Sequence, residues 1–180
     1  MPLIGDHAPE FHAMTTQGKI DFPADYKGSW VVLFSHPADF TPVCTTEFIA
    51  LSRMNETFES LNTKLIGLSI DSLHSHLGWI KSIEALNFNN EGKVKIPFPI
   101  IADISMNVAR KYGMLQTVAN TQTVRAVFII DPEGMIRTIL YYPMSTGRNI
   151  PEIIRILQSL QLNDQTHYST PANWQPGDAV

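Results

Sequence analysis

The sequence predicts an α/β fold in which a central mixed β-sheet is flanked by helices. Continuous apolar runs at 30–34 and 64–71 are typical of strands buried on both faces. Each run is followed by a segment whose apolar residues recur every three or four positions, as in an amphipathic helix. A turn at 131–134 joins two further apolar runs and predicts a hairpin. Strands that alternate with helices in this way form a sheet covered on both faces.

The N-terminal third of the chain is expected to contain a hairpin or edge element, a strand and a helix. Residues 2–28 are rich in turn formers and alternate only weakly, which predicts a short hairpin or edge element. The strand at 30–34 then ends in a polar turn, and a helix is expected to begin near Thr41 and Pro42. The apolar positions of this helix have helical spacing: Phe48, Leu51, Met54, Phe58 and Leu61.

The middle of the chain repeats the alternation. A buried strand at 64–71 leads to Ser72, which can cap a helix with Leu73, Leu77 and Ile80 on its apolar side. A loop through 89–92 leads to an apolar segment at 98–101 and then to a helix at about 105–112.

The C-terminal part predicts a hairpin of strands at 123–130 and 135–142, followed by a helix that opens near Pro151. The apolar face of that helix would carry Ile153, Ile154, Leu157 and Leu160. The resulting order, βαβαββα after an N-terminal extension, indicates a thioredoxin-like sheet. A flavodoxin-like fold stays open on the pattern alone, although no glycine-rich phosphate loop follows the first buried strand.

Composition narrows the class of protein. The 180 residues fit one domain, and 44% hydrophobic with 17% charged residues is ordinary for a globular protein. A net charge of −4 and scattered basic residues give no reason to expect nucleic-acid binding. The apolar runs are too short for a membrane span, and the first residues lack the pattern of a signal peptide. A single free cysteine excludes an intrachain disulfide and suggests the reducing cytoplasm.

That cysteine, Cys44, could be a small buried hydrophobe, as lone cysteines commonly are. The residues around it favour a reactive thiol instead. Thr41 is a natural N-cap and Pro42 suits the first helical position, which places Cys44 third in the helix, directly after a buried strand. Unpaired N–H groups and the positive end of the helix dipole favour a thiolate there.

A helix end supplies only about 0.3–1 kcal/mol, so an activated thiolate at Cys44 requires a cation beside it. Arg125 interrupts an apolar strand and is expected to emerge at the strand end that faces the site; a structural ion pair is the alternative. Arg148 lies on the loop before the last helix, where a site role and a solvated surface position are both open.

The spacing Thr41-x-x-Cys44 puts a hydroxyl where a disulfide oxidoreductase has its first cysteine, so no internal dithiol can form. The site therefore suits attack on a small polar oxidant. His74 and His76 are two residues apart, point to different helix faces and are interpreted as solvated. We expect no metal and no cofactor.

At this point the sequence resembles a known family. The segment Pro37-Ala38-Asp39-Phe40-Thr41-Pro42-Val43-Cys44 matches the peroxiredoxin pattern Pro-x-x-x-Thr-x-x-Cys. His36 before it and Thr45-Thr46-Glu47 after it resemble the one-cysteine branch of this thiol-specific antioxidant and alkyl hydroperoxide reductase family. The resemblance continues through 6–11, Arg125, 147–149 and 170–178, and so covers nearly the whole chain.

The resemblance implies a role for each matching residue. Cys44 would attack the peroxide and become a sulfenic acid. Thr41 would hydrogen-bond the peroxide, Pro37 would shield the sulfur from water, and Arg125 would stabilise the thiolate and the transition state. Glu47 and Arg148 would form a supporting ion pair. For His36, contact with Cys44 or the reductant and a histidine satisfied at the strand end remain two readings.

The resemblance also implies partners. The substrate would be hydrogen peroxide or an organic hydroperoxide, and the reductant an external thiol: a thioredoxin-like protein, glutathione or another small thiol. A homodimer is expected, with a larger ring as an extension of it. We interpret residues 1–162 as the thioredoxin-like domain and 163–180 as a C-terminal segment, the start of a truncated C-terminal arm.

Two other functional classes compete with the peroxidase. In a peroxide sensor or chaperone-like assembly, oxidation of Cys44 would change partner binding without sustained turnover. In a purely structural thioredoxin-like module, Cys44 would be inert and would react slowly with peroxide.

Overall fold

The computed structural model describes residues 1–115 and 121–180. These fall into two compact units, Met1–Arg148 and Asn149–Val180. The boundary predicted after residue 162 lies inside the last helix, α5 (Ile150–Thr166), and stays a prediction.

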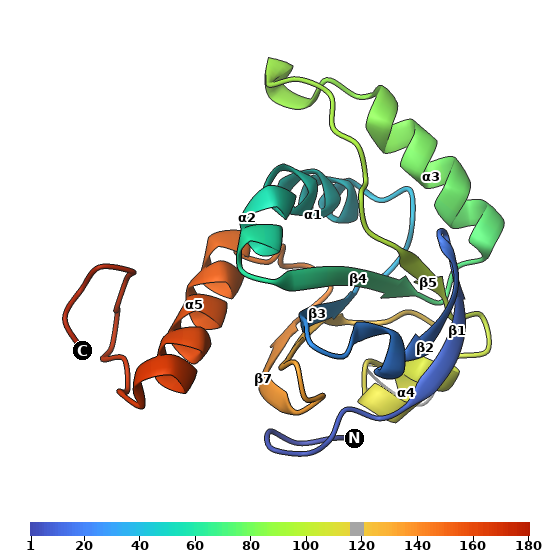
Figure 1. The fold of residues 1–180 in the computed structure, drawn as a ribbon. Helices are drawn as coiled ribbons and strands as arrows, with labels where there is room; N and C mark the ends of the chain where they lie inside the picture. Colours follow the sequence, from blue (N-terminus) through green and yellow to red (C-terminus); the bar gives the residue numbers. More distant parts are fainter. Residues whose placement is uncertain (116–120) are drawn as a thin grey trace. The chain divides into compact units, whose positions relative to one another are not determined.

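The first unit is built on a seven-stranded mixed sheet of order β2-β1-β5-β4-β3-β6-β7 (Figure 1). Strand β3 pairs in parallel with β4, as β4 does with β5, and the other pairings are antiparallel. The strands are β1 (Phe11–Thr15), β2 (Gly18–Phe22), β3 (Trp30–Ser35), β4 (Thr63–Ser69), β5 (Ile100–Ala102), β6 (Arg125–Ile130) and β7 (Ile136–Tyr142).

The central strands are the ones that the sequence marks most clearly. All six residues of β3 and all six of β6 are buried, as expected of continuous apolar runs with neighbours on both faces. The predicted N-terminal hairpin is β1–β2, and the predicted hairpin around residues 131–134 is β6–β7. These elements of the prediction are confirmed.

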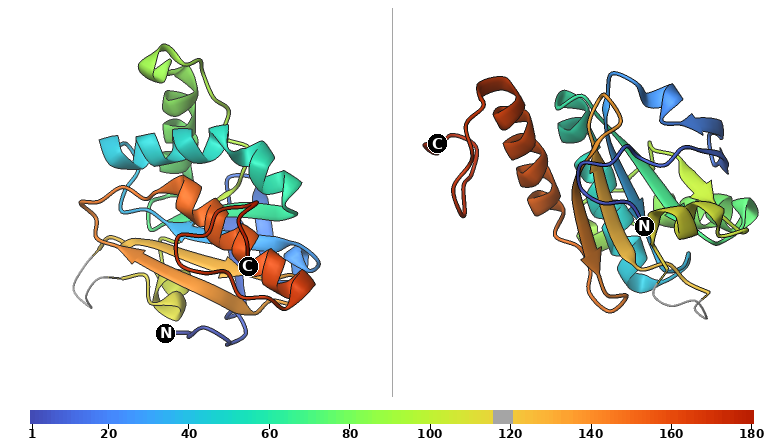
Figure 2. Two further views of the ribbon diagram at one scale, coloured as in Figure 1. Left: turned by 90° about the vertical axis from the view of Figure 1, so that its left-hand side faces the viewer. Right: turned by 90° about the horizontal axis from the view of Figure 1, so that it is seen from below.

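Helices cover both faces of this sheet. In two views at right angles, α1, α2 and α3 lie on one side of the sheet and α4 on the other (Figures 1 and 2). Aromatic rings join the layers: Phe34 of β3 meets Phe48 of α1 at 5.5 Å between centroids, and Phe128 of β6 meets Tyr112 of α4 at 5.1 Å. The helices of this unit are α1 (Pro42–Arg53), α2 (Asn55–Ser60), α3 (Leu73–Ala85) and α4 (Asn107–Tyr112), with short 3₁₀ turns η1 (Ala24–Tyr26) and η2 (Phe88–Asn90).

The single helix predicted from Pro42 to Leu61 is in fact two. The chain leaves the helical conformation at Met54, where φ is −93° and ψ is 2°. Neither proline nor glycine marks the break, and the spacing of Leu51, Met54 and Phe58 runs straight across it. Periodicity therefore could not indicate the interruption.

The predicted apolar face of α3 is only partly right, since Leu73 and Ile80 are half-buried but do not form the buried face. Its buried residues are His76, Trp79 and Ile83, whereas Leu77 is 40% exposed. His76, interpreted as solvated, is 0% exposed. The orientation of α3 is set by tertiary contacts, since Trp79 stacks on Phe48 at 4.5 Å. His74 is exposed, and Ser72 caps the helix by accepting a hydrogen bond from the Ser75 amide; both were predicted.

The predicted order βαβαββα left out a strand at 100–102, and it also did not count the helix that the sequence analysis expected at about 105–112. The missing strand, β5, has three residues and joins β4 to the N-terminal hairpin. The helix expected at about 105–112 is present as α4. A strand this short gives no periodic pattern to detect.

The second unit consists of α5 and the segment after it. The Asn149 side chain caps α5 by accepting a hydrogen bond from the Glu152 amide. The C-terminal segment folds back on the helix, because Arg155 donates to the Trp174 carbonyl at 3.2 Å. Ile153, Ile154 and Leu157 are buried as predicted, and Leu160 is half-buried. Among the helices of the described residues, none combines the length and apolar character needed to cross a membrane.

Gly67 in β4 provides a test of the packing between the sheet and α1. A Cβ atom at this position would lie 3.3 Å from the ring carbons of both Phe34 and Phe48. Because both rings are held in an aromatic cluster, Gly67→Ala should lower the free energy of unfolding by about 1–3 kcal/mol. Urea denaturation measures the change.

The matched control is Gly78→Ala on α3, where a Cβ would make an ordinary contact at 3.5 Å with Phe40. Alanine there should keep or raise stability, since it favours a helix over glycine by about 1 kcal/mol. A Gly67→Ala protein as stable as the wild type would show that the rings can move aside.

Candidate active site

Cys44 is the third residue of α1, after Thr41 at the N-cap and Pro42 at the first helical position, as predicted. Its side chain is completely buried. The Thr41 hydroxyl does not cap the helix, contrary to expectation: it donates to the Ala38 carbonyl at 2.7 Å. Thr41 thereby fixes the turn before α1 instead of the first helical N–H groups. Pro37 is buried in the same turn.

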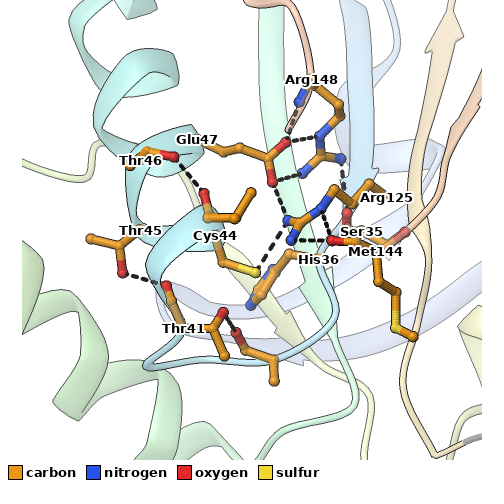
Figure 3. A network of polar contacts seen from close by, with 12 residues as sticks. Ser35, His36, Thr41, Cys44, Thr45, Thr46, Glu47, Arg125, Met144 and Arg148 are labelled. Atoms are coloured by element: carbon orange, nitrogen blue, oxygen red, sulfur yellow. Dashed lines mark hydrogen bonds and ion pairs between the residues drawn. The ribbon is translucent and has the colours of Figure 1, made fainter. Parts of the chain in front are cut away.

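Arg125 supplies the cation beside the sulfur. It is the first residue of β6, only 3% exposed, and its Nη1 donates to Cys44 Sγ at 3.3 Å (Figure 3). Its Nε and Nη2 both donate to the Met144 carbonyl, at 2.9 and 2.7 Å. All three nitrogens of the guanidinium thus donate hydrogen bonds, which fixes its orientation. No pattern in the sequence indicated that the Met144 carbonyl would accept hydrogen bonds from Arg125.

Glu47 lies one turn after Cys44 on α1, and its carboxylate is shared by two arginines (Figure 3). It accepts from Arg125 Nη1, from Arg148 Nε at 2.5 Å and from the Arg148 amide at 3.0 Å. Burial raises the pKa of Glu47, but the charge and hydrogen bonds of Arg148, together with the charge of Arg125, outweigh it. The pKa is therefore below its usual value.

Arg148 is buried, so the alternative of a solvated loop arginine is wrong. Besides Glu47, it donates to the carbonyls of Ser35 and Ala126 at 2.8 and 3.0 Å. Its guanidinium carbon lies 5.2 Å from the ring centroid of Phe34. The structure shows the ion pair expected as one alternative for Arg125, and the same guanidinium also contacts the sulfur; a catalytic role of Arg125 stays a prediction.

His36 is completely buried and belongs to a second network. Its Nε2 lies 2.7 Å from Asp39 Oδ1, and within the described part of the chain its Nδ1 has no hydrogen-bond partner. Burial lowers the pKa of His36. One ring nitrogen of His36 is therefore hydrogen-bonded at the strand end and the other is not, and both alternatives for the role of this residue stay predictions.

Asp39 and His76 are site residues that the sequence analysis missed. Asp39 Oδ2 lies 2.6 Å from His76 Nδ1 and 2.9 Å from Ser75 Oγ. Burial raises the pKa of Asp39, but the hydrogen bonds from His36 and His76 outweigh it and hold the pKa well below its usual range. Asp39 lies three residues after His36, a spacing that could have suggested a pair, whereas His76 is brought there only by the fold.

Among the described residues, His36, Asp39 and His76 also form a group with metal-ligating atoms close together, within 4.8 Å of one another. The N···O separations of 2.7 and 2.6 Å are hydrogen-bond lengths. Two ligands that each lie about 2.0–2.1 Å from one ion are normally about 3 Å apart or more. The geometry is that of shared protons.

Comparison with known proteins identifies the family. The family model described as AhpC/TSA family matches residues 4–139. The chain belongs to the peroxiredoxin (AhpC/TSA) family. A peroxiredoxin of Methanosarcina mazei is 63% identical over 182 residues, which cover 100% of this chain and 83% of that protein. A peroxiredoxin of Aquifex aeolicus is 52% identical, over 98% of this chain and 78% of its own.

Solved peroxiredoxin structures have the same fold. A cysteine-to-serine mutant of peroxiredoxin 6 from Arenicola marina is 41% identical, with a TM-score of 0.90 over 99% of this chain and 82% of that one. A yeast mitochondrial 1-Cys peroxiredoxin is 45% identical, with a TM-score of 0.89 over 99% and 85%. The thioredoxin-like fold is confirmed, and the single cysteine fits the one-cysteine type. The chain is accordingly a thiol-dependent peroxidase, an oxidoreductase.

Glu47→Gln tests the buried charge cluster. Removing one partner of a buried ion pair should cost about 3–5 kcal/mol of stability at neutral pH. The folded-state pKa of Glu47 lies below its unfolded value, so its contribution is present above the unfolded pKa and is lost as pH falls through the folded pKa. The stability difference between wild type and variant should therefore shrink in acid.

Urea denaturation over a series of pH values measures this difference. Glu152→Gln is the matched control, because Glu152 pairs with Arg155 at a more exposed position and its removal should cost under about 1 kcal/mol. A Glu47→Gln cost as small as the control, or one unchanged by pH, would contradict the prediction.

Proposed function

We propose that Cys44 is the peroxidatic thiol and that it reduces hydrogen peroxide and organic hydroperoxides. The observation that carries the proposal is the charge balance around Glu47. Two buried guanidiniums, Arg125 and Arg148, face a single buried carboxylate, which leaves one positive charge. A thiolate at Cys44, 3.3 Å from Arg125 Nη1, would balance that charge in a buried position where water cannot solvate it.

In the proposed reaction the thiolate attacks the terminal peroxide oxygen. An S–O bond forms as the O–O bond breaks, and the bonding electrons leave with the distal oxygen, which takes up a proton and departs as water or an alcohol. Cys44 is oxidised to a sulfenic acid. Arg125 would stabilise the charge that develops on the oxygens, Thr41 would hydrogen-bond the peroxide, and Pro37 would exclude water.

An external thiol is the proposed reductant, since the chain contains one cysteine. Its thiolate would attack the sulfenic sulfur and release water, leaving a mixed disulfide that a second thiol cleaves. The yeast 1-Cys peroxiredoxin is described with a thiol resolving mechanism through glutathione and thioredoxin systems. This supports glutathione or a thioredoxin-like protein as the reductant class here, with another small thiol as the remaining option.

We also propose a cytoplasmic homodimer that can extend into a ring. The family resemblance and the free thiol support it. Light scattering of the purified protein at several concentrations tests the assembly, and a strictly monomeric protein would refute it.

Replacing Cys44 or Arg125 tests the chemistry directly. Stopped-flow fluorescence of the pre-reduced protein should show oxidation by hydrogen peroxide far faster than that of free cysteine, and none in Cys44→Ser. Arg125→Lys keeps a positive charge but loses the donors to Met144 and Cys44, so the rate constant should fall roughly 10²–10³-fold.

Arg53→Lys, at an exposed ion pair with Glu91, is the matched control and should react like wild type. A wild-type rate no better than that of free cysteine would contradict the proposal. Mass spectrometry of quenched samples should identify the sulfenic acid.

Turnover distinguishes a peroxidase from a sensor. With excess peroxide and glutathione or thioredoxin, the protein should consume many equivalents of peroxide. Fast oxidation of Cys44 followed by no turnover with any thiol would favour the sensor.

A further inference from the structure

The turn between β3 and α1 carries Pro37 and Thr41, and its backbone is unusual. Phe40, in the middle of this turn, has φ of 57°, a left-handed conformation that an aromatic residue rarely adopts. Its side chain is 59% exposed, so burial of the ring does not account for the conformation. Such a conformation persists only where neighbouring contacts fix the chain.

Those contacts come from Asp39, the residue just before Phe40. Its carboxylate is bonded by His36 at the end of β3 and by Ser75 and His76 on α3. Its own amide donates to Asp71 Oδ2 at 2.9 Å. Both the side chain and the backbone of Asp39 are therefore tied to other elements, and the turn is fastened to α3.

The donors and acceptors determine where the protons lie. His76 Nε2 is 3.0 Å from the Ile101 carbonyl oxygen, which can only accept, so Nε2 carries a hydrogen. His76 Nδ1 faces the Asp39 carboxylate, which also accepts from Ser75. An ionised carboxylate accepts at both oxygens, so Nδ1 carries a hydrogen as well.

His36 has the complementary arrangement. Its Nε2 donates to Asp39 Oδ1, and Nδ1 is left without a partner in the described part of the chain. The three side chains then hold one positive and one negative charge, on His76 and Asp39, and a neutral His36. A buried group of this composition has no net charge, which a water-free site requires.

We propose that the Asp39 carboxylate and a doubly protonated His76 ring form a buried ion pair that positions the peroxide-binding turn over Cys44. This ion pair is called the lock below. The ion pair holds Asp39 on α3, and Asp39 holds the left-handed turn at Phe40. Thr41 is two residues further on and its hydroxyl donates to the Ala38 carbonyl of the same turn, so displacement of Asp39 would also move the Thr41 hydroxyl. Asp39 and His76 are positioning residues, and the inference rests on the peroxidase function proposed above.

Nitrogen-15 NMR of the reduced, histidine-labelled protein tests the proton arrangement. Both ring nitrogens of His76 should give the shifts of protonated nitrogens at neutral pH, and His36 should show one protonated and one bare nitrogen. A bare Nδ1 on His76 would overturn the lock as drawn. So would a metal ion bound stoichiometrically to the purified protein and removed by a chelator.

Asp39→Asn tests the positioning. The two imidazoles contact different oxygens of the Asp39 carboxylate, and asparagine has an NH2 donor in place of one of them, so one imidazole N–H would lose its acceptor and the turn should loosen. The rate constant for oxidation of Cys44 by hydrogen peroxide should fall roughly 10–100-fold. Reduction of the sulfenic acid by a thiol does not need the peroxide-binding turn, and its rate should change less than about twofold. A folding defect alone would not separate the two half-reactions.

Two further variants keep the test decisive. Ser75→Ala removes a single donor and should slow oxidation about threefold, which remains measurable if Asp39→Asn does not fold. His74→Gln changes an exposed histidine on the same helix and should react like wild type. Slow oxidation of the wild-type protein would refute the proposed peroxidase function itself. If the wild type is oxidised fast and a folded Asp39→Asn or Ser75→Ala protein is oxidised equally fast, only the lock would be refuted.

Discussion

The active site depends on one constraint, the balance of buried charge around Glu47. Isolated guanidiniums are costly away from water, and here two of them converge on one carboxylate. The carbonyls of Ser35, Ala126 and Met144 accept further hydrogen bonds from these guanidiniums but carry no formal charge. One positive charge is left over in this cluster, and Arg125 Nη1 lies 3.3 Å from the Cys44 sulfur. The residues that hold the local fold together are thus the ones that surround the sulfur.

The sheet brings these groups together through its topology. Strands β3 and β6 are antiparallel neighbours in which Phe34 pairs with Val127, so the end of β3 lies beside the start of β6. Helix α1 follows β3 directly, and Arg125 opens β6. Cys44 and Arg125 are 81 residues apart in sequence, yet the adjoining ends of two neighbouring central strands bring them into contact. Ser35 marks that junction, since its hydroxyl donates to the Val124 carbonyl and accepts from the Ala126 amide.

Local patterns predicted what depends on neighbouring residues. Continuous apolar runs predicted the buried strands, and the Thr-Pro pair predicted a helix start that makes Cys44 its third residue. Arg125 was selected because it is a charged residue within an apolar strand. The face of α3 could not be predicted, because the Trp79 ring packs against Phe48 and His36 from other elements. The burial of His76 has the same origin: its two partners, Asp39 and the Ile101 carbonyl, come from a turn and a short strand that only the folded sheet brings near.

Two buried polar networks meet at the end of β3. The carbonyl of Ser35 belongs to the arginine cluster, and the ring of the next residue, His36, belongs to the aspartate–histidine network. The Thr123 hydroxyl, bonded to the His36 carbonyl at 2.6 Å, fixes the backbone between them. The first network contacts the sulfur through Arg125, and the second holds the turn before α1 through Asp39. Because both are buried and hydrogen-bonded, neither can reorganise cheaply. A reactive sulfur in a completely buried position is compatible with this rigidity only if the oxidant is small, which is what a hydroperoxide offers.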